Sequence, residues 1–72
     1  MRNVNDKQVV DIALEILAGK ENCGLPATVS TSEVVTRFAS KGVHASMLSV
    51  AFALQSNLTR TTEENNSQRW TV

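Results

Sequence analysis

The sequence has few of the residues that cross-link or bend a chain, and no excess charge. Its single cysteine, Cys23, cannot form an internal disulfide, so the fold must depend on a hydrophobic core. It holds one proline and three glycines, and only 4% of its 72 residues are aromatic. Lys and Arg together number seven, as do Asp and Glu. This zero net charge means that binding to nucleic acid would require the cations to gather on one face.

Long hydrophobic runs are also lacking. No stretch approaches the roughly 20 apolar residues of a membrane span, and no N-terminal run resembles a signal peptide. We therefore expect a cytoplasmic protein without membrane contact, in which the lone cysteine stays reduced. With 42% hydrophobic residues, the chain has the composition of a globular domain. Its length favours one domain over residues 1–72, with residues 1–4 as a loose N-terminus.

Motifs for catalysis, metal binding and phosphate binding are missing as well. The sequence shows no Ser-His-Asp spacing, no paired carboxylates and no glycine-rich phosphate loop. Cys23 and His44 supply only two ligands, fewer than the three or four of a zinc site. We therefore predict that the protein is not an enzyme and needs no metal or cofactor.

The first periodic segment predicts a helix that begins near Asp6. Asn5 and Gln8 have the spacing of an N-cap pair. Gly19 is expected to end this helix, and Gly24 and Pro26 argue against regular structure in the connection that follows. Apolar residues recur on one helical face, at Val9, Ile12, Ala13, Ile16 and Leu17.

Residues 30–58 have the pattern of two helices joined by a tight turn. Ser30 and Glu33 have the spacing of a capping box, which begins the first helix. Gly42 stands where that helix would end in a left-handed residue, and a second helix is predicted from about Ala45 to Ser56. We expect its core face to hold Met47, Leu48, Ala51, Phe52, Leu54 and Leu58, and its outer face to hold Ser46, Ser49, Val50, Ala53 and Asn57.

From Leu58 the periodicity changes to two, which predicts strands. Residues 58–62 and 68–72 are rich in Thr, Val and Trp, and the polar residues 63–67 between them favour a turn. We expect a hairpin in which Trp70 and Val72 cover the helices while Arg69 and Thr71 point away.

The order helix, loop, helix, turn, helix, hairpin resembles that of winged helix-turn-helix domains. The resemblance rests on STSEVVTRFASKGV for the first helix of the pair, HASMLSVAFALQSNL for the recognition helix and LTRTTEENNSQRWTV for the wing. It implies an α+β fold of three helices with a C-terminal two-stranded hairpin, the wing. It also implies a short strand before the second helix, which residues 27–29 could form. Members of this superfamily are mostly bacterial, archaeal or phage transcription regulators that place the third helix in the major groove.

If the function transfers, the resemblance implies a small transcription regulator that binds double-stranded DNA, as a homodimer. The helix at 45–56 would then meet the bases, and the wing at 58–72 would meet the backbone or the minor groove. The implied DNA-contacting residues are Arg37, Lys41, His44, Ser46, Ser49, Arg60 and Arg69.

A second hypothesis is a winged-helix module that binds a protein and not DNA. Such a module could be a phage-encoded modulator or inhibitor of a host protein. The zero net charge favours it, because a neutral surface is not attracted to a polyanion. The expected outer helix face favours it too, because its small side chains carry little of the hydrogen-bonding code for bases.

Overall fold

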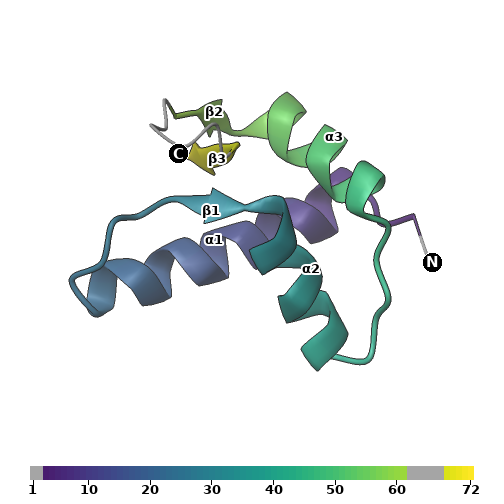
Figure 1. Cartoon of the computed structure of the whole chain (residues 1–72), viewed down its shortest axis with the longest axis horizontal. Helices are drawn as coiled ribbons and strands as arrows, with labels where there is room; N and C mark the ends of the chain where they lie inside the picture. The colour runs from purple at the N-terminus through teal and green to yellow at the C-terminus, as the bar shows by residue number, and fades with distance from the viewer. Residues whose placement is uncertain (1–2, 62–67) are drawn as a thin grey trace.

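Three helices and three short strands make up the part of the chain that the structure describes, residues 3–61 and 68–72 (Figure 1). The structure is a computed structural model. The fold is α+β, as the sequence predicts. In chain order the elements are α1 (Asp6–Asn22), β1 (Val29–Ser30), α2 (Thr31–Ser40), α3 (Met47–Asn57), β2 (Thr59–Arg60) and β3 (Arg69–Thr71).

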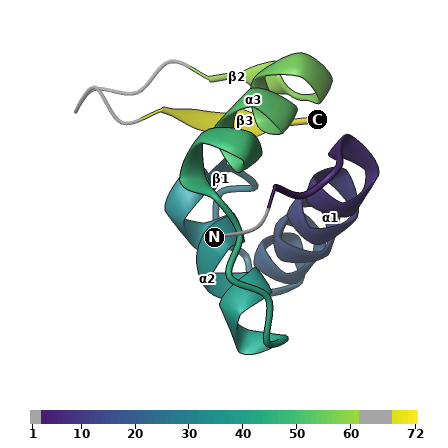
Figure 2. The same ribbon diagram turned by 90° about the vertical axis from the view of Figure 1, so that its right-hand side faces the viewer.

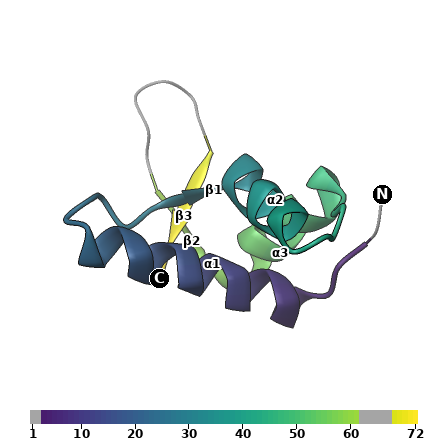
Figure 3. The ribbon, with the colours of Figure 1, turned by 90° about the horizontal axis from the view of Figure 1, so that it is seen from below.

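The strands form one antiparallel sheet in the order β1-β3-β2. Trp70 at its centre is paired with Val29 on one side and with Arg60 on the other. A short strand does precede α2, but it is Val29–Ser30 and overlaps the expected residues 27–29 only at Val29; it is a third strand beside β2 and β3. Figure 3 shows the strands over one half of α1 and the α2–α3 pair over the other half. The turn predicted at residues 63–67 lies outside the described residues.

Both predicted helix caps are present, and the Asn5–Gln8 pair, like Ser30–Glu33, is a complete capping box. Asn5 Oδ1 accepts from the Gln8 N–H at 2.8 Å, and Gln8 Oε1 accepts from the Asn5 N–H at 3.0 Å. The Ser30 hydroxyl accepts from the Glu33 N–H at 3.3 Å, and the Glu33 carboxylate accepts from the Ser30 N–H at 3.1 Å. Each pair satisfies backbone N–H groups that have no partner inside the helix, and this fixes where α1 and α2 begin.

The helix ends depend on two glycines with positive φ. Gly42, as predicted, has φ +80° just after α2. The prediction that Gly19 ends α1 was wrong, because the helix continues to Asn22. A glycine inside a helix costs only about 1 kcal/mol, which the rest of a long helix can offset. The stop comes at Gly24, whose φ of +73° lets the Leu25 N–H reach back to the Lys20 carbonyl.

The core lies between α1, the α2–α3 pair and the sheet (Figure 2). Trp70 is fully buried, as expected, and its Nε1 has no hydrogen-bond partner among the described residues, so packing holds the ring. Two expectations at the chain ends need correction. Val4, expected in a loose terminus, is buried with 8% exposure, whereas Val72, expected to cover the helices, is 77% exposed because it lies beyond the last strand pair.

The buried face of α3 differs from the expected one. Val50 and Ala53, expected outside, are buried together with Leu54. Leu48 and Phe52, expected in the core, are 68% and 66% exposed. Seven of the eleven residues of α3 are apolar, so its periodicity fits more than one stripe. Packing against α1 and α2 selects the stripe that is buried.

No helix in the described ranges 3–61 and 68–72 is long and apolar enough to cross a membrane.

Candidate functional site

Two of the cations expected to contact DNA lie against α1. The Arg37 guanidinium donates to the Glu15 carboxylate at 2.6 Å. The ammonium of Lys41, just after α2, is 3.9 Å from the other oxygen of the same carboxylate. These side chains are between 42% and 49% exposed, so water screens the pairs strongly. Glu15 nevertheless offsets part of the positive charge of Arg37 and Lys41.

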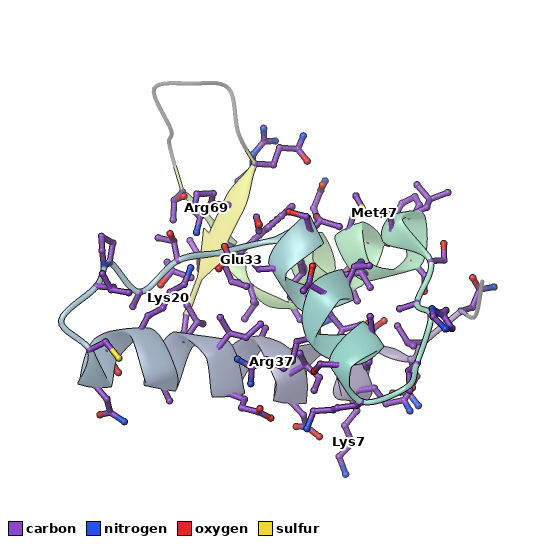
Figure 4. The ribbon with its side chains drawn as sticks, turned by 60° about the horizontal axis from the view of Figure 1, so that its bottom comes forward. Lys7, Lys20, Glu33, Arg37, Met47 and Arg69 are labelled. Carbon is purple, nitrogen blue, oxygen red and sulfur yellow. The ribbon has the colours of Figure 1, made fainter. Side chains whose placement is uncertain are left out.

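Arg69, expected to point away from the helices, belongs to a cluster that joins three elements (Figure 4). Its guanidinium donates to the Thr28 hydroxyl at 2.8 Å and to the Glu33 carboxylate at 2.6 Å. Lys20 of α1 donates to the Thr28 carbonyl at 2.6 Å and lies 2.5 Å from the second oxygen of Glu33. We call Lys20, Thr28, Glu33 and Arg69 the Glu33 network. Thr71 also points inward, because its hydroxyl donates to the Ala27 carbonyl.

The environment of Glu33 favours its charged form. Partial burial of the carboxylate acts to raise its pKa, because burial disfavours a charge. Hydrogen bonds from Lys20 and from the Ser30 N–H, with the positive charges of Lys20 and Arg69, outweigh this effect. The pKa of Glu33 is therefore lowered, and its carboxylate pairs with Lys20 of α1 and Arg69 of β3.

The two serines expected near bases have structural partners. The Ser46 hydroxyl caps α3 by accepting from the Ser49 N–H at 3.4 Å. The Ser49 hydroxyl accepts from the Val4 N–H at 3.2 Å and donates to the Val4 carbonyl at 3.1 Å. The contacts of Ser49 tie the N-terminal segment to α3, so this hydroxyl has a structural role.

Most of the cations in the described residues are paired with carboxylates. His44 and Arg60 are exposed, and neither has an ion pair within the described part of the chain. Of the six Lys and Arg residues that the structure describes, four have a carboxylate within 4 Å. The remaining two, Lys7 and Arg60, belong to α1 and β2.

The outer face of α3 is apolar instead. Met47, Leu48 and Phe52 are 49%, 68% and 66% exposed, and Ala51 between them is half-buried. At 100° per residue these four positions share an arc of about 140° on the helix. We call them the α3 patch. No residue of α3 carries a charge. Met47, the first residue of α3, is labelled in Figure 4.

A groove runs beside the α3 patch. Its volume is about 370 Å³, and its apolar lining residues are Val4, Leu48 and Phe52. Asp6 also lines it, and the Asp6 carboxylate accepts from the Asn57 amide at 3.0 Å. The full lining consists of Asn3, Val4, Asp6, Ser46, Leu48, Ser49 and Phe52.

Sequence reasoning missed this surface because it assigned Leu48 and Phe52 to the core. The signal that could have found it is the surplus of apolar residues in α3. One buried stripe of an eleven-residue helix needs about four of them, yet α3 has seven. The described residues contain no group of three or more His, Cys, Asp or Glu side chains placed to hold a metal ion.

No known protein family, curated protein sequence or solved structure gives a significant match to this chain.

Proposed function

We propose that this protein is a protein-binding module that contacts its partner through the α3 patch. The observation that carries the proposal is the exposure of Leu48 and Phe52, 68% and 66%, on one uncharged helix face. Burying such a side chain is worth about 1.5–3 kcal/mol, and the described fold leaves that stabilisation unused. Contiguous exposed apolar side chains rimmed by polar groups are typical of protein interaction sites.

The charges of the molecule support the same proposal. A helix that reads bases usually presents Arg, Lys, Asn or Gln to the groove edges. On the face of α3 that holds the α3 patch, Gln55 is the one residue of these types, and its neighbours there are apolar. Arg37 and Arg69, which would have met phosphates, each contact a glutamate at 2.6 Å. Phosphate contacts dominate the affinity of DNA-binding proteins, so this pairing disfavours strong DNA binding.

For the fold we propose a winged helix-turn-helix. The order of the elements, the glycine turn between α2 and α3, and the sheet order β1-β3-β2 support this assignment. In such a layout α3 is the helix left most open to a ligand. The assignment agrees with a module whose binding face is α3, because fold alone does not fix what that face binds.

One observation favours a DNA-binding regulator as a second candidate. Arg60 on β2 and His44 just before α3 are exposed and flank the two ends of the open helix. They could contact phosphates while the apolar face of α3 meets thymine methyl groups. This candidate predicts measurable affinity for a random DNA duplex that falls steeply as salt increases, and that weakens when Arg60 is replaced by alanine.

The test of the proposed function compares three immobilised proteins in extract from the source cells. These are the wild type, Phe52→Glu and the control Leu25→Glu, whose leucine is 57% exposed in the loop after α1. We expect the wild type and the control to retain the same partner and Phe52→Glu to lose it. Equal retention by all three proteins would contradict the proposal. Salt-sensitive duplex binding by the purified wild type would favour the regulator.

A further inference from the structure

The groove beside the α3 patch has one charged side chain in its lining, that of Asp6. Its apolar lining residues are Val4, Leu48 and Phe52, and the other described residues that line it are polar and neutral. No Lys, Arg or His is among these described lining residues. The groove therefore combines an apolar surface with a single negative charge.

The charge of Asp6 is not offset by a cation within residues 3–61 and 68–72, whereas Glu15 and Glu33 each contact two cations. Asp6 Oδ2 accepts from the Asn57 amide, and the same amide donates to the Ala53 carbonyl at 2.8 Å. This neutral amide holds the carboxylate beside the end of α3 and leaves its charge in place. Asp6 Oδ1 has no hydrogen-bond partner in the described part of the chain and can accept from a ligand.

We propose that the partner of the α3 patch is a basic amphipathic segment of another protein, and this inference rests on the proposed function. An apolar side chain of the segment packs in the groove against Leu48 and Phe52. A neighbouring Lys or Arg of the segment pairs with the Asp6 carboxylate. Burial of the apolar side chain supplies most of the affinity, and the ion pair selects among apolar segments by their charge.

The same carboxylate disfavours other occupants. An acidic segment or a DNA phosphate would bring a second negative charge near Asp6, and no described cation lines the groove to offset it. The residues of α3 carry no charge that would reverse this preference. A neutral apolar segment would bind without the ion pair and would lack this source of selectivity.

The size of the groove limits what the segment can insert. Its volume of about 370 Å³ lies at the lower end of the roughly 300–1,000 Å³ that ligand pockets span. The eleven-residue helix beside it is only about 16 Å long. The contact therefore suits a short segment and not a whole domain face. For such a contact we expect a dissociation constant of about 10 μM–1 mM.

The experiment selects peptides from a display library of random short peptides on three immobilised proteins. These are the wild type, Asp6→Asn and the control Asp11→Asn. Asp6→Asn keeps an oxygen that can accept from the Asn57 amide but removes the charge. Asp11 is also exposed on α1 and has no ion pair with another described residue, but it does not line the groove. Both variants thus lose one negative charge, and only one of them loses it from the groove.

Peptides selected on the wild type and on the control should be enriched in Lys or Arg beside an apolar residue. Peptides selected on Asp6→Asn should keep the apolar residue and lose the basic enrichment. A synthetic peptide of the selected sequence should bind Asp6→Asn about 2–5-fold more weakly than the wild type, as expected for an exposed ion pair. Replacing its basic residue by glutamine should abolish this difference. Circular dichroism checks that each variant is folded.

A further variant, Phe52→Ala, separates this inference from the proposed function. It should weaken binding of the synthetic peptide at least about 10-fold, because it removes the apolar contact. Selected peptides without basic enrichment, or with equal affinity for the wild type and Asp6→Asn, would overturn the inference. A library that yields no peptide dependent on Phe52 would also overturn it. The proposed function would still stand if a partner from the extract is retained by the wild type and lost by Phe52→Glu.

Discussion

Replacing Glu33 by glutamine should destabilise the fold by about 1–2 kcal/mol. The carboxylate lies 2.5 Å from Lys20 and 2.6 Å from Arg69, and it accepts from the Ser30 N–H at 3.1 Å. It thereby joins α1, α2 and β3. Glutamine keeps the shape and one acceptor oxygen for the Ser30 N–H but removes the negative charge. The two cations then remain near each other, since both donate to the Thr28 carbonyl.

The magnitude follows from the exposure of these groups. The side chains of Lys20, Arg69 and Glu33 are 18%, 25% and 32% exposed. Fully exposed ion pairs contribute about 0.2–1 kcal/mol each, and removing one partner of a buried charged hydrogen bond costs about 1.5–3 kcal/mol. Two half-buried pairs therefore fall between these limits. For a domain of this size the loss corresponds to a fall in Tm of roughly 5–15 °C.

Urea unfolding measures the effect, with Trp70 as the probe because this tryptophan is fully buried and is the only one. The matched control is Glu15→Gln. Glu15 also contacts two cations, but it is 46% exposed, so its loss should cost under about 0.5 kcal/mol. A Glu33→Gln cost as small as that of the control would refute the reasoning, because partial burial would then add nothing to the ion pairs.

The same comparison has a defined pH dependence. The pKa of Glu33 is lowered in the folded state, so the folded protein binds fewer protons at this site than the unfolded chain does. The stabilisation is therefore fully present above the unfolded pKa of about 4.3 and is lost as pH falls through the folded pKa. The stability gap between wild type and Glu33→Gln should be constant near neutral pH and close in acid. A gap that persists in acid would contradict this account.

Three further predictions test the fold, each by urea unfolding. Val50→Ala should lower the free energy of unfolding by about 1–3 kcal/mol, whereas Phe52→Ala should change it by less than about 0.5 kcal/mol. The reverse order would mean that the buried face of α3 is misassigned. Gly42→Ala should lower the free energy of unfolding by about 1–2 kcal/mol, because φ at this position is +80°. Gly19→Ala should instead raise it by up to about 1 kcal/mol, because Gly19 lies inside a helix with open space for a Cβ. Equal effects would contradict the turn geometry. Trp70→Ala should cost about 3–5 kcal/mol, and a smaller loss would mean that the tryptophan is not central to the core.

The helix starts and the turn between α2 and α3 were predictable because they depend on neighbours in sequence. The two capping boxes join Asn5 to Gln8 and Ser30 to Glu33, residues three positions apart. Gly42 adopts positive φ for a reason that concerns its own backbone alone. The change of periodicity at Leu58 likewise predicted the strands that follow α3. Each of these features can be recognised from nearby residues, without knowing how the elements pack.

The candidate site was much less predictable. The Glu33 network joins positions 13 and 36 residues apart, counted from Glu33 to Lys20 and from Glu33 to Arg69. No local pattern indicates that these side chains meet. Sequence reasoning therefore counted Lys20 and Arg69 as available to a ligand, although both are paired with Glu33. The partners of Ser49 are equally distant, because its hydroxyl bonds to Val4, 45 residues away.

The sequence by itself determined the α+β class, the helix caps and the turn at Gly42, because each depends on interactions within a few residues. The exposed surface was decided only by the tertiary structure. α3 has more apolar residues than one buried stripe needs, so its sequence is compatible with more than one buried face. Packing against α1 and α2 buries Val50 and Leu54 and leaves Leu48 and Phe52 outside. The candidate binding face is therefore a result of how the elements pack, and no single segment encodes it.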